Sequence, residues 1–356
     1  MRIVVEAIKH TANKVIEAPF DKKLETGNYL NLSTFDAFLS VVKRNILLRL
    51  LLQHRYLKDA ITTADKNILW IHSTTENIGD SLMKLSSIAY LHKKEHIVDL
   101  CLPPYIVDLY QNNAYCNSVF SIDKINTISR AYDLIIIDSL GSKPLRLKNK
   151  YFKHSAFVTL YGYFNYYRPD YNTTLFSFYR MQYLLRTNEP IEDITRPFIG
   201  NPVVTNIDVE SKAIAFVVGG TGIGYKHWEK VIDILDAKIS DKKSIILVGS
   251  ENGIKDSEYI SSKFISRSGF INTVGKLTLA ETASVISHCD LIIGVDGGLL
   301  HIASALRIKI VALFIGGVEP EFYFTKATRC WKICGENDPN DIKPISIVNK
   351  ILEVYK

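Results

Sequence analysis

Cysteine is scarce in this sequence, and the few cysteines present are widely separated. The 356-residue chain contains five, an odd number. This scatter argues against a disulfide scaffold and is typical of a reducing cytoplasm. Cys330 and Cys334 lie close together, but no Cys or His pair follows at the spacing of zinc ligands. We therefore expect no metal site.

The sequence also lacks a hydrophobic run long enough to cross a bilayer, which takes about 20 residues. The most apolar early stretch, NILLRLLL, is far shorter. The chain begins MRIVVEAIKH, where charged residues return too soon for a signal peptide. We expect a soluble or peripheral cytoplasmic protein, with the inner face of the plasma membrane as the peripheral location.

Acidic residues are absent from the stretch between residues 37 and 58, which is rich in Leu and Ile. Five basic residues punctuate it: Lys43, Arg44, Arg49, Arg55 and Lys58. A basic amphipathic helix can lie on an anionic membrane surface, so residues 43–58 are a candidate membrane contact. The alternative is a helix that packs on the neighbouring domain and leaves its basic residues in water.

No long basic stripe and no RNA- or DNA-binding motif occurs, so we expect no nucleic-acid partner. The formal net charge is only +6, which favours anionic partners in general, such as nucleotide phosphates. A hydrophobic content of 47% with 22% charged residues is typical of a folded globular chain. Its length suits about two domains of roughly 150 residues each.

Strand-like and helical segments alternate from residue 67 onwards. The strand-like runs are NILWIHS, IVDLCLP, YDLIIIDSL, SAFVTLYGY, AIAFVVGG, KSIILVGS, DLIIGVDGG and IKIVALFIGG. This alternation predicts α/β architecture with doubly wound parallel sheets. We expect a largely helical extension over 1–66, a Rossmann-like domain over 67–190, a proline-containing linker over 191–211, and a second Rossmann-like domain over 212–356 that faces the first across a cleft.

Three stretches at predicted strand ends carry the chemistry, because parallel sheets bind ligands at the carboxyl ends of their strands. The first, VVGGTGIGYKHW, has the glycine spacing of a phosphate-binding P-loop. A true P-loop needs a lysine where Tyr225 stands and a hydroxyl residue after it. Thr221, Gly222 and Lys226 are therefore candidates for a different kind of diphosphate site, and an ordinary strand-to-helix turn is the alternative.

The second stretch, DGGLLHIASAL, follows a strand that ends at Asp296. Gly297 and Gly298 stand before a predicted helix, whose N-terminus can bind a diphosphate through backbone N–H groups. Asp296 is a candidate to fix the turn or to bind a sugar hydroxyl. His301, one turn into the helix, is a candidate donor to a phosphate or to the leaving group.

The third stretch, HSTTENIGDSLMKLSSIAYL, places Asp80 at the start of another predicted helix. That helix runs over GDSLMKLSSIAYLHKK, with Leu82, Leu85 and Ala89 on one face. Its carboxylate is either a helix cap or a general base that takes a proton from an acceptor hydroxyl. The aromatic segment TLYGYFNYYRPDYNTTLFSFYR offers Tyr163 and Arg168 for stacking on a sugar and pairing with an acidic acceptor. The alternative is that its tyrosines pack between helices.

Taken together and in this order, the three stretches resemble glycosyltransferase family nine, the ADP-heptose:lipopolysaccharide heptosyltransferases. Gly79-Asp80 looks like the Gly-Asp of that family, and Lys226-His227-Trp228 is similar to its Lys-x-Trp segment. The run from Asp296 to His301 matches its Asp-Thr-Gly-x-x-His signature, except that Gly297 replaces the threonine. The resemblance covers residues 67–356.

The resemblance implies a GT-B fold whose C-terminal domain binds the donor and whose N-terminal domain binds the acceptor. It implies inverting sugar transfer without a metal or other cofactor, with Asp80 as the base and Lys226 on the donor phosphates. By the same resemblance, Glu251 is a candidate for the donor ribose hydroxyls. The implied partners are a nucleotide sugar, with ADP-heptose first, and a lipopolysaccharide core or other glycolipid or oligosaccharide acceptor.

Three features depart from the family pattern: the extension over 1–66, a longer loop before Asp80, and FIGGVEPEFY after the last predicted strand. Two alternatives therefore stay open. The segment NIGDSL also resembles the start of polysaccharide pyruvyltransferases, which would transfer pyruvate from phosphoenolpyruvate. The protein could also be a non-catalytic scaffold that binds a nucleotide sugar.

Overall fold

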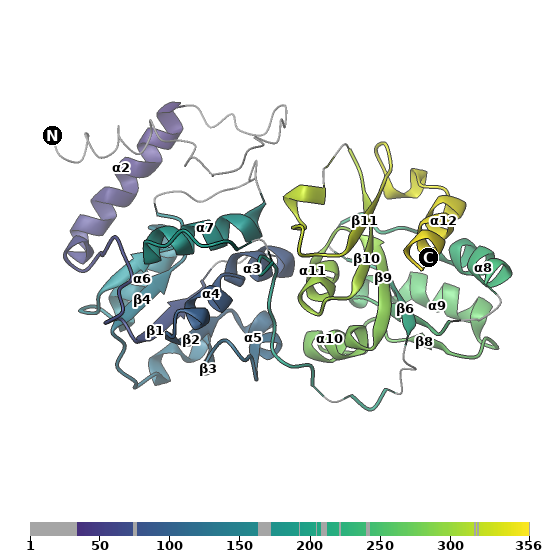
Figure 1. The fold of residues 1–356 in the computed structure, drawn as a ribbon, viewed down its shortest axis with the longest axis horizontal. Coiled ribbons are helices and arrows are strands. Elements are labelled where there is room, and N and C mark those ends of the chain that lie inside the picture. Colours follow the sequence, from purple (N-terminus) through teal and green to yellow (C-terminus); the bar gives the residue numbers. More distant parts are fainter. Residues whose placement is uncertain are drawn as a thin grey trace. The chain divides into compact units, whose positions relative to one another are not determined.

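The computed structural model describes residues 34–73, 77–162, 172–191, 193–203, 205–207, 212–220, 222–239, 243–316, 318 and 320–355 (Figure 1). The chain divides into two compact units. The first comprises Met1–Glu76 and Lys84–Thr195, and the second comprises Asn77–Met83 and Arg196–Lys356. A short N-terminal segment thus belongs to the unit that is otherwise formed by the C-terminal half.

A parallel sheet with the order β3-β2-β1-β4-β5 forms the centre of the first unit. Its strands are β1 (Asn67–Ile71), β2 (Ile97–Leu102), β3 (Ser118–Ser121), β4 (Leu134–Ile137) and β5 (Phe157–Thr159). The chain winds outward from β1 in one direction and from β4 in the other. The point of reversal therefore lies between β1 and β4, which are hydrogen-bonded neighbours.

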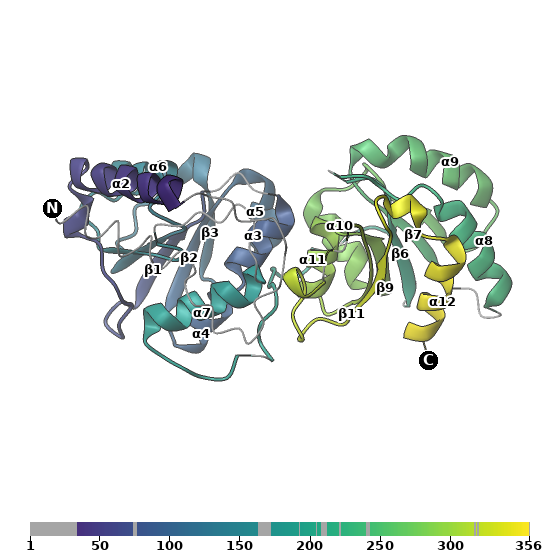
Figure 2. The same cartoon turned by 90° about the horizontal axis from the view of Figure 1, so that it is seen from above.

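Helices cover both faces of this sheet, with α2 and α6 on one side and α4 and α7 on the other (Figure 2). The helices are α2 (Thr34–Leu50), α3 (Ile78–Leu85), α4 (Ile88–Lys93), α5 (Pro104–Tyr110), α6 (Ser142–Tyr151) and α7 (Thr173–Leu185), with the 3-10 turns η1 (Gln53–Arg55) and η2 (Ile122–Thr127). Strands that are apolar on both faces explain this layering, because each face must be buried. The predicted α/β architecture is confirmed here.

The helix that the sequence predicts over GDSLMKLSSIAYLHKK is interrupted at Ser86 and Ser87, which separate α3 from α4. The Ser177 hydroxyl of α7 donates to the Lys84 carbonyl and lies 2.7 Å from the Ser87 hydroxyl. A side chain from a neighbouring helix thus satisfies a carbonyl near the break. Leu82, Leu85 and Ala89 are buried as the apolar periodicity predicts.

The described part of the N-terminal extension packs on the first unit. Leu48 of α2 joins the core cluster that contains Leu69, Ile135 and Phe157. The Phe157 N–H donates to the Tyr56 carbonyl, and the Lys58 N–H donates to the Phe157 carbonyl. The segment after α2 therefore hydrogen-bonds along the free edge of β5. This outcome agrees with the packed-helix alternative for the basic stretch.

The second unit contains a six-stranded parallel sheet with the order β11-β10-β9-β6-β7-β8. Its strands are β6 (Ala213–Val217), β7 (Ile245–Val248), β8 (Phe270–Asn272), β9 (Cys289–Val295), β10 (Lys309–Phe314) and β11 (Cys330–Cys334). The order reverses between β6 and β9, as in the Rossmann arrangement. Every strand predicted from the sequence is present in the two sheets.

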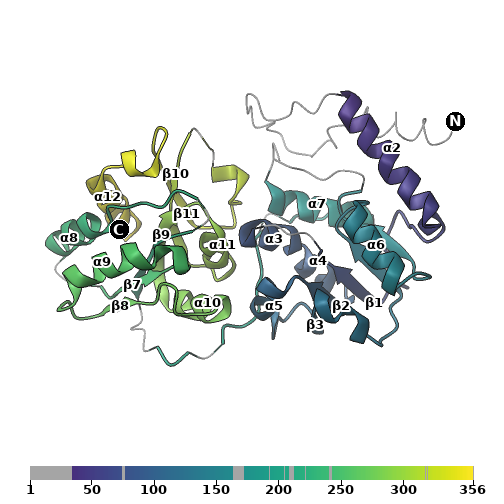
Figure 3. The same cartoon turned by 180° about the vertical axis from the view of Figure 1, so that it is seen from behind.

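Helices again cover both faces, with α8 and α12 on one side of the sheet and α10 and α11 on the other (Figures 2 and 3). The helices are α8 (Trp228–Lys238), α9 (Ile254–Phe264), α10 (Leu279–Ser287), α11 (Gly298–Ala305) and α12 (Pro344–Val354), with the 3-10 turns η3 (Glu251–Gly253), η4 (Pro320–Phe322) and η5 (Pro339–Asp341). Trp228 and Ile351 anchor α8 and α12 in the core. Among the described residues, no helix is both long and apolar enough to span a membrane.

Candidate functional site

The candidate donor-binding stretches of the second unit follow three neighbouring strands. The glycine-rich loop follows β6, Glu251 follows β7, and Asp296 follows β9. These strands are parallel and adjacent in the sheet, so their carboxyl ends open at one edge. The loops after β6 and β9 flank the point where strand order reverses, which is where open α/β sheets bind their ligands.

The glycine-rich loop after β6 requires glycine at two positions. Gly219 has φ 83° and Gly220 has φ 148°, which non-glycine residues rarely adopt. A Cβ atom on Gly219 would also lie 2.7 Å from the Gly253 backbone. The loop backbone is thus packed directly on η3, while Gly222 is exposed with open space around it. Thr221 lies outside the described residues.

Tyr225, which occupies the place of a Walker lysine, is a core residue. Its side chain is 3% exposed, its ring lies edge-on to Trp228, and its hydroxyl donates to the Ile342 carbonyl at 3.0 Å. The neighbouring Lys226 is exposed and lies two residues before the first residue of α8. The Lys226 ammonium is therefore accessible to an anion, but it does not sit at the P-loop position.

Two asparagines that the sequence analysis did not select hold this loop in place. The Asn252 side chain accepts the Gly220 N–H at 3.1 Å and donates to the Gly220 carbonyl. The Asn340 side chain accepts the Lys226 N–H at 2.7 Å and donates to the Gly224 carbonyl at 3.2 Å. Asn340 lies more than 100 residues from the loop in sequence. No local pattern could have revealed that pairing.

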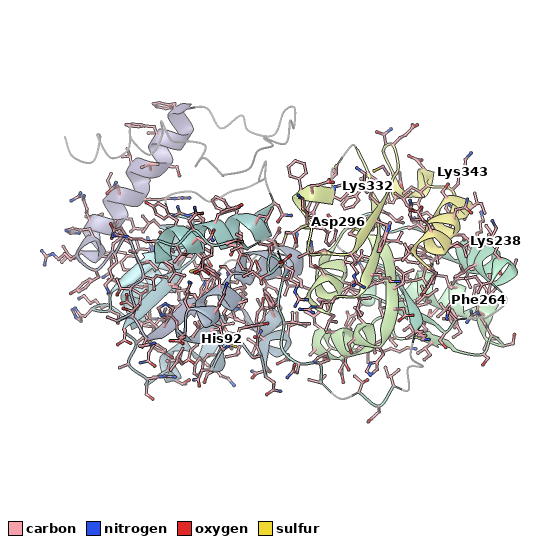
Figure 4. All side chains as sticks on the ribbon, in the orientation of Figure 1. His92, Lys238, Phe264, Asp296, Lys332 and Lys343 are labelled. Carbon is pink, nitrogen blue, oxygen red and sulfur yellow. The ribbon has the colours of Figure 1, made fainter. Side chains whose placement is uncertain are left out.

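The turn between β9 and α11 places Asp296 directly before Gly297 and Gly298 (Figure 4). Gly297 is extended, with φ 172° and ψ 178°, and a Cβ atom there would approach nothing closer than 3.7 Å. The position therefore has room for a side chain. At Gly298, a Cβ atom would lie 3.0 Å from Cβ of Ile78. The helix begins at Gly298, one residue earlier than the sequence suggested.

His301 is almost fully buried, with 2% of its surface exposed. Its ring stacks on Phe324 at a centroid distance of 5.1 Å. Burial lowers the pKa of His301 to about 4, so the imidazole is neutral at pH 7. Its Nδ1 atom has no hydrogen-bond partner among the described residues, which is unusual for a buried ring nitrogen.

Asp296 lies beside His301 but does not hydrogen-bond to it, since 4.0 Å separates Asp296 Oδ1 from His301 Nε2. Burial and then the charge of Asp80 raise the pKa of Asp296 to about 6. The Asp296 carboxylate and the neutral His301 therefore do not form an ion pair at pH 7. Asp296 Oδ1 is also buried without a partner in the described part of the chain.

The first turn of α3 brings Asp80 into the same unit as Asp296 and His301. Gly79 packs so closely on His301 that a Cβ atom would lie 2.5 Å from His301 Cδ2. Glycine at this position is thus required by a close approach rather than by its φ angle. The structure brings together the Gly-Asp pair and the Asp-Gly-Gly-x-x-His stretch, which are separated by more than 200 residues.

In the first unit, a buried His72–Asp138 pair occupies the reversal point between β1 and β4. His72 Nδ1 lies 2.8 Å from Asp138 Oδ1, and Asp138 Oδ2 accepts the Ser73 N–H at 2.9 Å. Burial alone would raise the pKa of Asp138, but the His72 charge and these hydrogen bonds hold it below its usual range. No sequence motif indicates this pair, although both residues lie near the ends of predicted strand-like runs.

Both predicted acceptor contacts, Tyr163 and Arg168, lie outside the described residues. Within the described ranges, no group of three or more His, Cys, Asp or Glu side chains is placed to hold a metal ion. All five cysteines are free thiols. Cys330 and Cys334 both lie on β11.

Residues 192–337 match the family model described as glycosyltransferase family 9 (heptosyltransferase). The chain carries a glycosyltransferase family 9 domain. The matched segment contains the glycine-rich loop, Lys226, Glu251 and the whole turn from Asp296 to His301. The matched segment covers less than half of the chain and supports the glycosyltransferase activity that the motifs predict.

Solved structures of family 9 glycosyltransferases share the fold at low sequence identity. A family 9 glycosyltransferase from Veillonella parvula is 13% identical, with a TM-score of 0.66 over 84% of this chain and 100% of that chain. Escherichia coli ADP-heptose lps heptosyltransferase II is 18% identical, with a TM-score of 0.62 over 81% and 98%. E. coli heptosyltransferase WaaC with ADP is 14% identical, with a TM-score of 0.61 over 81% and 99%.

These similarities confirm the predicted GT-B fold with two Rossmann-like parallel sheets. No curated protein sequence matches the chain. Because all three structures are less than 25% identical to this chain, they establish its fold and not its substrates.

Proposed function

We propose that the protein is an inverting, metal-independent glycosyltransferase that moves heptose from ADP-heptose onto a lipopolysaccharide or lipooligosaccharide core, or a related glycan. The observation that carries this proposal is the cluster of Asp80, Asp296 and His301. It unites a candidate base with the N-terminus of α11 in one unit. ADP-heptose is the first candidate donor because a heptosyltransferase of E. coli with this fold was solved with ADP.

In this proposal, residues 212–356 form the donor domain. Lys226 and the N-terminus of α11 at Gly297-Gly298 hold the diphosphate, because a lysine ammonium and free backbone N–H groups both attract anions. Thr221 and Gly222 line the phosphates from the glycine-rich loop. Glu251 accepts hydrogen bonds from the ribose hydroxyls, which its exposed place after β7 permits.

Asp80 acts as the general base in the transfer step. It takes the proton of the acceptor hydroxyl while that oxygen forms a bond to the anomeric carbon of the sugar. The bond from the anomeric carbon to the β-phosphate oxygen breaks in line, and the nucleoside diphosphate leaves with the electron pair. Attack opposite to the leaving group inverts the anomeric configuration.

His301 and Asp296 assist the donor rather than move the acceptor proton. A neutral imidazole with an unpartnered Nδ1 can donate one hydrogen bond to a phosphate or to the leaving oxygen. The unpartnered Asp296 Oδ1 can accept one from a sugar hydroxyl. Both atoms are buried without a hydrogen-bond partner among the described residues, beside the turn that is proposed to bind the diphosphate. Because buried polar atoms are normally hydrogen-bonded, this supports a ligand there.

Residues 67–190 are the proposed acceptor domain, with Tyr163 and Arg168 as its contacts. The free cysteines support a location in the cytoplasm, where thiols stay reduced. In that location, the enzyme would bind its nucleotide sugar on the inner side of the plasma membrane.

Nucleotide binding tests the donor half of this proposal. Calorimetry with ADP, UDP, GDP, CDP and ATP, with and without magnesium, should show a preference for ADP that does not need the metal. Lys226→Ala should weaken ADP binding about tenfold or more, since it removes a charge-assisted contact. Lys230→Ala is the matched control, because Lys230 is exposed on α8 outside the candidate site. A strict requirement for magnesium and ATP would contradict the proposal.

Turnover tests the reaction itself. Asp80→Asn should abolish heptose transfer to a core oligosaccharide while it leaves ADP affinity unchanged. Full activity of this variant would exclude Asp80 as the base. Transfer of pyruvate from phosphoenolpyruvate would replace the proposal with the pyruvyltransferase alternative, and tight ADP binding without turnover of any donor would favour the non-catalytic one.

A further inference from the structure

Helix α2 has apolar residues on two opposite sides, and only one of them packs on the first unit. Val41 and Leu48 are buried, at 1% and 3% exposure. On the opposite side, Phe35 is 66% exposed, Ile46 is 44% exposed and Leu50 is 75% exposed. Steps of three, four, seven or eight residues return to the same side of a helix, so these exposed residues form one stripe.

The stripe continues past the end of the helix. Leu52 is 48% exposed and has φ 56°, a left-handed backbone that is uncommon for leucine and costs of the order of 1 kcal/mol. Together with Phe35, Lys43, Ile46, Leu50 and Arg55, it forms what we call the outer face of α2. Large apolar side chains gathered in this way are a feature of interaction surfaces.

Hydrogen bonds beneath the helix fix the orientation of this face. Gln53 is fully buried, and its side-chain amide donates to Asn149 Oδ1 at 2.8 Å and to the Lys153 carbonyl at 3.1 Å. Gln53 Oε1 accepts a hydrogen bond of 2.5 Å from Lys148 Nζ of α6. Rolling α2 to bury its outer face would break this network and pull Leu48 out of the core. The apolar stripe is therefore held in its exposed position.

Between residues 37 and 58, the charged residues around the outer face are all basic. Lys43 lies within the stripe, and His54 and Arg55 are exposed beside Leu52. No acidic residue occurs between positions 37 and 58. A second copy of the chain packed on this face would bring basic residues against basic residues, which is unfavourable. An anionic lipid surface offers apolar chains for the stripe and negative headgroups for its rim.

We propose that the outer face of α2 docks the protein on an anionic membrane surface. Docking does not require transfer activity. It rests on the proposed function only in one respect, namely that docking would hold the enzyme beside a lipid-linked acceptor. Apolar burial and electrostatic attraction act together in such interfacial contacts, and each basic residue near the surface contributes about fivefold in affinity.

Vesicle sedimentation with the full chain tests this proposal. The wild-type protein should bind vesicles of equal parts phosphatidylglycerol and phosphatidylcholine, and should bind pure phosphatidylcholine vesicles at least tenfold more weakly. Ile46→Glu combined with Leu50→Glu should reduce binding to the anionic vesicles by at least tenfold. Arg55→Gln should reduce it about fivefold, and added salt should weaken the wild-type protein.

Ile265→Glu is the matched control, since Ile265 is 86% exposed but lies in the second unit. This variant should bind vesicles like the wild type. Far-UV circular dichroism and urea unfolding report whether every variant is folded. ADP binding is measured separately, and its loss would bear on the proposed function and not on docking. Equal vesicle binding by the wild type and the Ile46/Leu50 double variant would overturn the proposal. A wild-type dimer that is detected by sedimentation velocity and abolished by the same double substitution would also overturn the proposal.

Discussion

Asp138 fixes the start of the segment that leads to Asp80, because its two carboxylate oxygens hold two consecutive residues at the end of β1. One oxygen lies 2.8 Å from His72 Nδ1, and the other accepts the Ser73 N–H at 2.9 Å. Both Asp138 and His72 are buried at the reversal point of the first sheet. We infer that this pair holds His72 and Ser73 in place after β1, from where the chain continues towards the proposed base.

Asp138→Asn should lower the free energy of unfolding by about 3 kcal/mol, because a buried carboxylate that contacts the His72 ring and accepts the Ser73 N–H becomes a neutral amide. It should also lower kcat several-fold with little change in ADP affinity, since the donor site lies in the other unit. Urea unfolding, transfer kinetics and calorimetry measure the three quantities. The combination distinguishes a positioning role from a general loss of folded protein.

Asp133→Asn is the matched control for this variant. Asp133 Oδ2 accepts the Asn67 N–H at 2.8 Å, at the opposite end of the same strand, but the Asp133 side chain is exposed. Losing that contact should cost about 1 kcal/mol or less and leave kcat unchanged. Equal kinetic effects of the two substitutions would contradict the positioning role of Asp138.

Gly79→Ala should be destabilising even though alanine is the better helix former. In an ordinary helical position the change would favour folding by up to about 1 kcal/mol. Here the new methyl group would lie 2.5 Å from His301 Cδ2, and His301 is held by stacking on Phe324. We expect a net loss of about 1–3 kcal/mol by overpacking, together with a lower kcat.

Gly297→Ala and Gly297→Thr serve as the comparison for Gly79→Ala. Gly297 is extended, and the nearest atom to a Cβ there is 3.7 Å away. Both substitutions should therefore leave thermal unfolding within about 0.5 kcal/mol of the wild type. Restoring the threonine of the family signature should keep or raise activity. A severe loss of stability in Gly297→Ala would show that the turn is tighter than described.

The central strands and the motif residues could be predicted from the sequence, whereas three edge strands could not. β6 and β9 are continuous apolar runs because both of their faces are buried. The missed strands β3, β8 and β11 all lie at sheet edges, where short segments with polar residues suffice. Edge strands carry a weaker pattern because one side of each pairs with nothing.

Residues that act across long sequence separations were also missed. Asn340 and the His72–Asp138 pair are defined by partners that lie far along the chain. Asp80 was found because it stands beside a glycine at a helix start, but the reason for that glycine, its contact with His301, needed the fold. Local patterns report on helix ends and strand ends, while the pairing of those ends follows from topology.

Asp296 and His301 should make opposite contributions to stability at acid pH. The pKa of His301 falls from 6.5 to about 4 on folding, so the unfolded chain binds a proton first and stability is lost as pH falls from about 6.5 to 4. The pKa of Asp296 rises from 3.8 to about 6, so the folded chain binds a proton first and stability is gained as pH falls from about 6 to 4. Each contribution amounts to about 3 kcal/mol, so the two nearly cancel.

Substituting either residue should expose the contribution of the other. Relative to the wild type, Asp296→Asn should lose stability as pH falls from 6.5 to 4, and His301→Gln should gain it over the same range. Urea unfolding at a series of pH values measures both slopes. If both variants ran parallel to the wild type between pH 6.5 and 4, the burial of these two groups would not shift their pKa values as described.

Asn340 should be needed for nucleotide binding although we assign it no contact with the nucleotide. Its side chain holds the Lys226 N–H and the Gly224 carbonyl, so it fixes the backbone on both sides of Tyr225. Asn340→Ala would release that backbone while Tyr225 stays in the core. We expect ADP affinity to fall about tenfold, since a preorganised loop binds with a smaller loss of entropy.

Asn349→Ala is the matched control for Asn340→Ala. Asn349 accepts an exposed hydrogen bond of 3.4 Å from Lys238, which is the last residue of α8, whereas Lys226 precedes the first. This control should bind ADP like the wild type in calorimetry. Combining Asn340→Ala with Lys226→Ala separates two mechanisms. If Asn340 acts by placing Lys226, the double variant should bind no more weakly than Lys226→Ala alone, whereas additive losses would mean that Asn340 supports the nucleotide independently of that lysine.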